Sequence, residues 1–540
     1  MANKQAKPGQ RSSPDIPPVS AAESFDSKDS EIVIGLVGPT GADIKGITAL
    51  LKTFLEHPLE YDVEVIKITD LLQADEQLRS YVKPYNERDY NEKINALMQA
   101  GNDLRQATQR TDILALLAIN HINEPREQKQ LTLDTGEKEV QDLYKGRKVY
   151  IVHQFKHPDE VRTFRSVYGP GFYLLGVNTS YHKRKNRFTR MGVAPIEADT
   201  TLERDLDEDS EYGQHTRDTF ALADAYVATE RLPEEVEADV IRFLNIIFGD
   251  PYETPTRDEY CMFLAYAASF RSADLSRQVG AVLVSEQGDI TATGSNEVAM
   301  AGGGQYWAGE VPRCRDCERS EDSNHRERSN IIEELVRKVL DGFQSKKLDK
   351  DRLWSIFRGS SVWGITEYGR SIHAEMEAIL SCGRAGISTR GGVLYTTTFP
   401  CHNCAKHIVD AGIRRVVFVE PYPKSRAPEL LSDSILVKGE QISQKPEDHA
   451  CIDPNDDRKV VFEPFIGVSA RKFVDLFSVH LTTGRIVKRK DRNGRTIPFS
   501  LSAESNVKVA MMPSSYLDRE RIAGYYYSEA IERLRAMRNK

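Results

Sequence analysis

Apolar residues in the first half of the chain occur in two alternating patterns, as short continuous runs and at helical spacing. Four short apolar runs predict buried strands, at 31–37, 61–68, 148–153 and 171–177. Three intervening segments repeat apolar residues at helical spacing and predict helices, at 44–54, 91–119 and 160–167. Strands that alternate with helices are typical of a mainly parallel sheet, which we expect to extend to about residue 230.

The alternation of predicted strands and helices is interrupted near residue 250 and continues in a second α/β unit. A predicted helix at 233–248 leads into GDPYETP at 249–255, where the prolines and the glycine indicate a junction between domains. Beyond it, four runs predict strands, at 279–285, 289–294, 392–397 and 415–419. Helical spacing predicts helices at 258–270, 330–343, 372–380, 401–411 and 528–537.

These elements divide the 540 residues into four parts. Residues 1–30 are rich in small and polar residues and predict a disordered lead-in. Residues 31–250 predict a parallel-sheet domain, 251–484 a second α/β domain, and 485–540 a C-terminal extension that is basic at its start. The acidic run at 203–211 is typical of a solvated loop.

Composition narrows the class of protein. The net charge of -8 argues against a general nucleic-acid coat. Seven cysteines, four of them in two CxxC pairs, indicate metal chemistry in a reducing compartment rather than a disulfide scaffold. We find neither an apolar run of membrane-spanning length nor a signal-peptide core, and we expect a soluble cytoplasmic protein without a membrane partner.

One constellation has a specific chemistry. His373 and Glu375 are followed, after 24 residues, by Pro400, Cys401 and Cys404, which is the H-x-E…P-C-x-x-C pattern of zinc deaminases. Histidine and two thiolates supply three ligands for Zn²⁺ and leave a fourth position for water. We expect both cysteines at a helix start, with the proline in the first turn. Glu375 is the predicted catalytic proton shuttle between that water and a cytosine ring.

Residues 257–424 resemble the deoxycytidylate deaminase branch of the cytidine deaminase superfamily. The resemblance rests on the zinc pattern, on YCMFLAYAASFRSADLSRQVG at 260–280 and on LYTTTFPCHNC at 394–404. It implies an α/β/α sandwich in which Asn296 contacts the sugar of the substrate. Arg271 and Gln278 are further candidates for phosphate or pocket contacts. A second CxxC at Cys314 and Cys317, with His325 nearby, leaves open a structural zinc or two free loop thiols.

The glycine-rich turn after the first strand resembles a phosphate-binding loop. Gly38, Gly41 and Lys45 are the candidates for phosphate contact, but the Gly-Lys pair is missing, Asp43 stands at the position of the second glycine, and Lys45 is one position late for the lysine of the motif. The segments around 149–165, 172–190 and 221–230 resemble deoxynucleoside monophosphate kinases. A regulatory domain that binds a nucleotide or RNA, a kinase and a purely structural partner remain alternatives.

Together, the two halves resemble the bacterial anti-phage deoxycytidine nucleotide deaminases, in which a P-loop kinase-like domain precedes a deaminase domain. The resemblance implies conversion of dCTP and dCMP to dUTP and dUMP during phage infection, control by the first domain, in some members through a small RNA, and a homo-oligomer. One rival is a deaminase of tRNA or single-stranded DNA, for which the basic stretch at 485–495 could bind the strand. Another is a catalytically silent nucleotide sensor.

Overall fold

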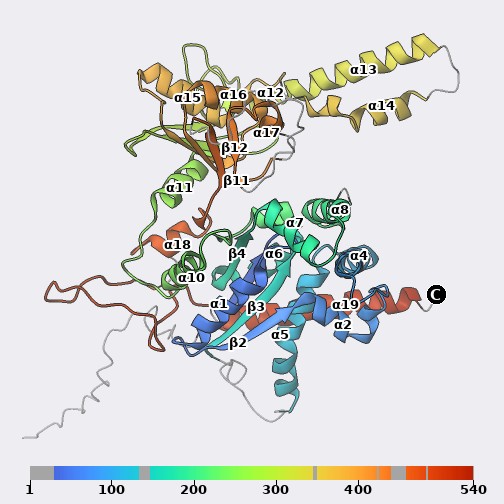
Figure 1. Cartoon of the computed structure of the whole chain (residues 1–540), viewed down its shortest axis with the longest axis vertical. Helices are drawn as coiled ribbons and strands as arrows, with labels where there is room; N and C mark the ends of the chain where they lie inside the picture. The colour runs from blue at the N-terminus through green and yellow to red at the C-terminus, as the bar shows by residue number, and fades with distance from the viewer. Residues whose placement is uncertain are drawn as a thin grey trace, which may run out of the picture.

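The computed structural model describes residues 30–132, 146–208, 210–343, 349–365, 367–422, 425–438, 458–481, 485–511 and 513–538. Apart from residue 30, the predicted disordered lead-in lies outside these ranges. The described residues form two six-stranded sheets, each covered by helices on both faces, and one two-stranded sheet (Figure 1). No helix among them is both long and apolar enough to cross a membrane.

The first sheet is mainly parallel, as the sequence predicts. Its order is β14 (Gly467–Val468), β5 (Ala225–Ala228), β4 (Phe172–Asn178), β1 (Ile32–Val37), β3 (Lys148–Phe155) and β2 (Asp62–Lys67). Strands β1 to β5 pair in parallel, and only the short β14 is antiparallel to its neighbour. The central β1 therefore lies where the chain order reverses, the place at which open α/β sheets form ligand sites.

Alternate residues of β1 belong to different cores. Ile32, Ile34 and Leu36 pack with α1 (Ile44–Glu56) and α10 (Pro233–Ile247). The opposite face packs against three other helices, α5 (Ile113–Thr132), α6 (Pro158–Tyr168) and α19 (Pro513–Arg538). Burial on both faces explains why the strands read as nearly continuous apolar runs.

The helices of this domain differ from the prediction in two places. The predicted helix 91–119 is two helices, α4 (Tyr90–Thr108) and α5, because Gln109 turns into the left-handed region at φ 52°. The acidic run predicted as a solvated loop begins inside α8 (Pro195–Leu206), where Asp205 is fully buried. The remaining helices are α2 (Ile68–Ala74), α3 (Glu76–Arg79), α7 (Tyr181–Arg190) and α9 (Thr216–Phe220).

The second sheet forms the middle of the predicted α/β/α sandwich. Its order is β12 (Ile435–Val437), β13 (Val460–Pro464), β11 (Arg415–Glu420), β10 (Val393–Thr398), β6 (Gly280–Val284) and β7 (Ile290–Ser295). Helix α11 (Arg257–Ser269) contributes Met262 and Ala265 to one face. Helices α15 (Ala374–Ala385) and α16 (His402–Asp410) cover the other.

The irregular stretch between β7 and α15 contains more helix than predicted. Helix α13 (Ser323–Phe343) starts before the predicted 330, and with α14 (Lys350–Arg358) it forms the arm at the upper right of Figure 1. The short elements of this domain are β8 (Glu297–Val298), β9 (Ser371–Ile372), α12 (Asp316–Arg319) and α17 (Ala427–Leu430).

After the second sheet the chain returns to the first. Strand β14 pairs with β5, α18 (Phe473–Phe477) follows, and α19 packs along α5. Glu259 of α11 fastens this crossing: it accepts two hydrogen bonds of 2.8 Å from Arg242 and one of 2.7 Å from the amide of Val468. The sequence-based division counts 467–484 with the second domain and 485–540 as an extension, whereas β14 and α19 pack on the first sheet.

Candidate active site

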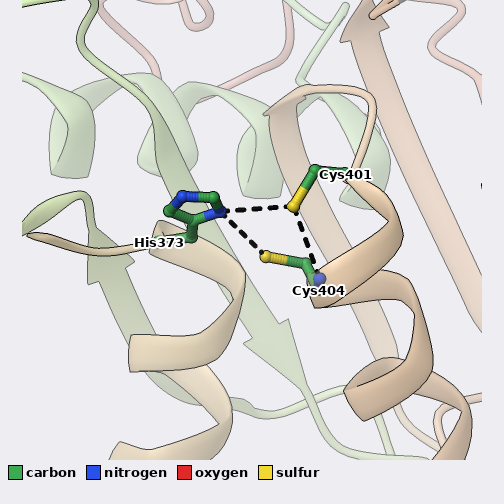
Figure 2. A group of neighbouring side chains, drawn as sticks. All are labelled: His373, Cys401 and Cys404. Atoms are coloured by element: carbon green, nitrogen blue, oxygen red, sulfur yellow. Dashed lines mark hydrogen bonds between the residues drawn. The ribbon is translucent and has the colours of Figure 1, made fainter. Parts of the chain in front are cut away.

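Three ligand side chains converge at the edge of the second sheet. The Nδ1 atom of His373 lies 3.4 Å from the sulfur of Cys401 and 3.3 Å from that of Cys404 (Figure 2). One ligand atom from each residue falls within 4.8 Å of the others, the spacing of a metal site. Among the described residues, this is the one group of three or more His, Cys, Asp or Glu side chains with that spacing.

Two helix starts bring the ligands together. His373 is the N-cap of α15, directly after β9, and Cys401 is the N-cap of α16, after β10. The amide of Cys404 donates to the sulfur of Cys401 at 3.5 Å, and exposed amides at a helix start favour thiolates. Pro400 precedes the N-cap, so the expectation that it lies in the first helical turn is wrong.

The predicted proton shuttle lies beside the ligands. Glu375 is 4% exposed, and the thiol of Cys404 donates to its Oε2 at 3.6 Å. Burial raises the pKa of Glu375 to about 7, since removal from water disfavours the carboxylate. A carboxyl group with a pKa near neutrality can both accept and deliver a proton.

The ligands polarise one another. Hydrogen bonding from Cys404 and His373 outweighs burial and lowers the pKa of Cys401 to about 4. The hydrogen bond with Cys401 is the main cause that raises the pKa of His373 to about 9. One imidazole nitrogen and two sulfurs that meet at a point fit zinc, which prefers nitrogen and sulfur ligands in tetrahedral sites. The three residues leave a fourth coordination position for water.

Asn296 and Gln278 both contact the loop that joins α11 to β6. Asn296 is 7% exposed, and its side-chain amide both accepts and donates a hydrogen bond. Its Oδ1 accepts from the Val279 amide at 2.7 Å, and its Nδ2 donates to the Arg277 carbonyl at 2.8 Å. Gln278 is solvent-exposed and donates to the Ser272 carbonyl at 2.7 Å. Both side chains therefore hold the backbone of the 270–279 loop.

Arg271 is also committed to the protein. Its guanidinium donates to the Ser295 hydroxyl at 3.0 Å, to the side chain and carbonyl of Gln305, and to the carbonyl of Tyr306 at 3.1 Å. It also lies 3.9 Å from the ring centroid of Trp307. This arginine ties the loop to the segment after β8, an arrangement that the sequence does not reveal.

The second CxxC does not form a comparable cluster. Cys314 is partly exposed and Cys317 is exposed, and within the part of the chain that the structure describes neither joins a group with metal-ligand spacing. His325 instead packs edge-on against Trp363, with ring centroids 5.2 Å apart. Of the two alternatives from the sequence, the arrangement favours free loop thiols.

The glycine-rich turn of the first sheet is shaped by close packing. Gly38 is buried, and a Cβ there would lie 2.9 Å from both Ile44 and the Val177 carbonyl. Gly41 has φ +86°, a conformation that favours glycine. Lys45 is exposed.

The loop contacts a different lysine and a carboxylate that the sequence does not predict. The amide of Thr40 donates to Oδ2 of Asp205 at 2.7 Å, and Lys156 donates to Oδ1 at 2.6 Å. Lys156 also donates to the Gly38 carbonyl at 3.1 Å. Asp205 comes from α8, 165 residues along the chain from Thr40. The Thr40 amide of this loop is thus already occupied by an internal carboxylate.

Part of the second domain is similar to known proteins. Residues 255–420 match the family model described as the cytidine and deoxycytidylate deaminase zinc-binding region. ComE operon protein 2 of Bacillus subtilis (strain 168) is 41% identical over 73 residues, which are 14% of this chain and 39% of that protein. Deoxycytidylate deaminase of Enterobacteria phage T2 is 46% identical over 55 residues, which are 10% of this chain and 29% of that enzyme. The chain thus spans less than two fifths of the length of these relatives.

A solved structure is similar at lower identity. The apo crystal structure of dCMP deaminase from the cyanophage S-TIM5 aligns with 39% of this chain and 100% of its own, at 17% identity and a TM-score of 0.21. The family match extends from the start of α11 to β11 and contains the metal ligands and Glu375. Residues 255–420 thus match a zinc-binding region, and zinc is the metal that the His–Cys–Cys centre of this region holds.

Proposed function

We propose that the chain is a zinc-dependent hydrolase that deaminates deoxycytidine nucleotides, converting dCMP and dCTP to dUMP and dUTP with release of ammonia. The buried Glu375 beside the three ligands is the observation that carries the proposal. The family match to residues 255–420 supports a hydrolytic deaminase, and the similarity to deoxycytidylate deaminases supports dCMP as a substrate.

Each side chain of the site has a role in the proposed reaction. When bound, zinc acts as a Lewis acid that makes a water molecule acidic enough to supply hydroxide near neutral pH. Glu375 accepts the proton of that water as its oxygen adds to C4 of the cytosine ring, and it passes the proton to N3. Glu375 then takes the proton of the new C4 hydroxyl and passes it to the leaving amino group, so that ammonia departs and C4 becomes a carbonyl. His373, Cys401 and Cys404 remain ligands throughout.

A parallel assay of four substrates tests the proposal. Purified full-length protein is incubated with dCMP, dCTP, CTP and a cytosine-containing single-stranded oligonucleotide, and released ammonia and uracil products are measured. We expect turnover of the two deoxycytidine nucleotides and loss of that turnover in Glu375→Ala. Deamination of the oligonucleotide alone would replace our proposal with the polynucleotide alternative.

The start of the basic C-terminal stretch is attached to the segment between the two domains. Arg489 donates through Nε to the Pro251 carbonyl at 2.7 Å, and the Tyr252 hydroxyl donates to the Arg489 carbonyl at 2.7 Å. The backbone amide of Arg485 donates to the Lys508 carbonyl at 2.7 Å. These contacts hold the segment against the junction between the domains.

We infer that the first domain is regulatory rather than a kinase. Asp205 at the Thr40 amide supports this role, because a carboxylate there competes with phosphate. We further propose that a nucleotide or a small RNA acts on this domain, that the chain forms a homo-oligomer, and that dC nucleotide depletion limits phage growth. Phage plaque counts with wild type and Glu375→Ala, and light scattering of the pure protein, test the last two points.

A further inference from the structure

The 270–279 loop is a rigid rim between α11 and β6. The Ser272 hydroxyl donates to the Asn296 carbonyl at 2.7 Å, and the side chain of Asn296 bonds to both Val279 and Arg277. Because the backbone carbonyl of Arg277 is one of these anchors, the position from which its side chain extends is fixed.

This rim lies beside the metal centre. Tyr422 packs against the core cluster that contains Cys401 and Cys404, and the Ser425 hydroxyl donates to the Pro400 carbonyl at 2.8 Å. The guanidinium of Arg277 lies 5.8 Å from the ring centroid of Tyr422. The loop after β11 therefore links Arg277 to the segment that supplies the two cysteine ligands.

The guanidinium of Arg277 is exposed and only weakly paired. Its side chain is 54% exposed, and its nearest carboxylate, on Glu420, is 4.0 Å away, at the outer limit of an ion pair. Arg271, the arginine that the sequence favours for phosphate, already donates to four acceptors within the protein. A guanidinium with open donors matches the geometry of a phosphate group, which it can bind through two parallel hydrogen bonds.

We propose that Arg277 binds the 5′-phosphate of the substrate and makes the site selective for nucleotides over nucleosides. This inference rests on the proposed deaminase function. Arg277 lies over Tyr422, which packs against the core cluster that contains two of the metal ligands, so a phosphate on a base held at Glu375 is within the reach that we propose for this arginine. Arg277 is a binding and selectivity residue that takes no part in proton transfer.

The test compares substrates that differ only in the phosphate. The value of kcat/KM is measured for dCMP and for deoxycytidine with wild type, Arg277→Gln and Arg277→Lys, and zinc content and melting temperature verify folding. Arg390→Gln is the matched control, because Arg390 is exposed and lies in the turn before β10, at the opposite end of the strand that leads to Cys401. Calorimetric titration of dCMP and deoxycytidine measures binding without turnover.

We expect Arg277→Gln to lower the ratio of kcat/KM for dCMP to that for deoxycytidine about 10- to 100-fold, the value of a charged hydrogen-bond pair. Arg277→Lys should lose less, and Arg390→Gln should keep the wild-type ratio. An unchanged ratio in folded, zinc-loaded Arg277→Gln would overturn the inference. If wild type turns over neither compound, the proposed function fails separately, and calorimetry decides: dCMP binding that weakens in Arg277→Gln supports the inference, and binding that does not weaken, or no binding, overturns it.

Discussion

The glycine-rich turn and the metal centre occupy equivalent places in their sheets. Each follows the carboxyl end of a strand, β1 or β10, and each uses the start of a helix. At the metal centre, three ligand atoms face one another across 4.8 Å or less. At the turn, the carboxylate of Asp205 already accepts the Thr40 amide and pairs with Lys156. The same architectural position thus serves an external group in one domain and an internal one in the other.

The largest expected effect comes from removing a ligand. Cys404→Ala leaves His373 and Cys401 as the only two protein ligands, so we expect the zinc content to fall toward zero and deamination to become undetectable. Helices α15 and α16 also lose the metal that joins them, so the melting temperature should drop. Metal analysis and calorimetry of the purified variant measure both effects. Full zinc content in Cys404→Ala would show that another residue completes the centre.

The next effect separates catalysis from metal binding. Glu375→Gln keeps the size of the side chain but cannot shuttle protons, and we expect kcat to fall about 10²- to 10⁴-fold with zinc retained. Glu377→Gln is the matched control, because Glu377 is also buried on α15 but pairs with Arg384. Equal losses in both variants would contradict the assigned role of Glu375.

A third variant tests the internal carboxylate. Asp205→Asn leaves the partly buried Lys156 without its counter-charge, and we expect the first domain to lose about 3 kcal/mol of stability in urea unfolding. Inorganic pyrophosphate should restore part of that loss in the variant and have little effect on wild type. Asp199→Asn removes a more exposed pair with Lys185 and should cost at most about 1 kcal/mol. Equal losses of stability in the two variants would show that Asp205 does not stabilise the loop.

The smallest effect is expected at the second CxxC. Cys314→Ser and Cys317→Ser should keep one zinc per chain and wild-type deamination, because neither cysteine joins a cluster of metal-ligand spacing among the residues that the structure describes. Mass spectrometry of the native protein counts the zinc. Two zinc ions in wild type and one in either variant would make this loop a second metal site.

The comparison also explains what could be predicted from sequence. His373, Glu375, Cys401 and Cys404 act through short spacings within two helix starts, so their pattern is visible in the chain. Asp205 could not be found in this way, because its partner lies 165 residues away and acidic runs are usually solvated.

Other features depend on the folded backbone. The break after Thr108 needs the left-handed φ of Gln109, which apolar periodicity does not encode. An arginine that fastens a loop, such as Arg271, and an arginine open to solvent, such as Arg277, look alike in sequence. Only the surrounding carbonyls and carboxylates distinguish them.

The hydrogen bond between Glu259 and Val468 affects how the chain can be divided into fragments. Through its carboxylate, the first turn of α11 lies against the amide of Val468, so the chain enters and leaves the second α/β unit through neighbouring positions. Segments whose two ends meet are the ones that tolerate excision and insertion. The stretch from Thr256 to Phe465 therefore has the geometry of a transplantable cassette, whereas a fragment that stops at residue 250 would lack β14 and α19 and leave one sheet edge and one helical face bare.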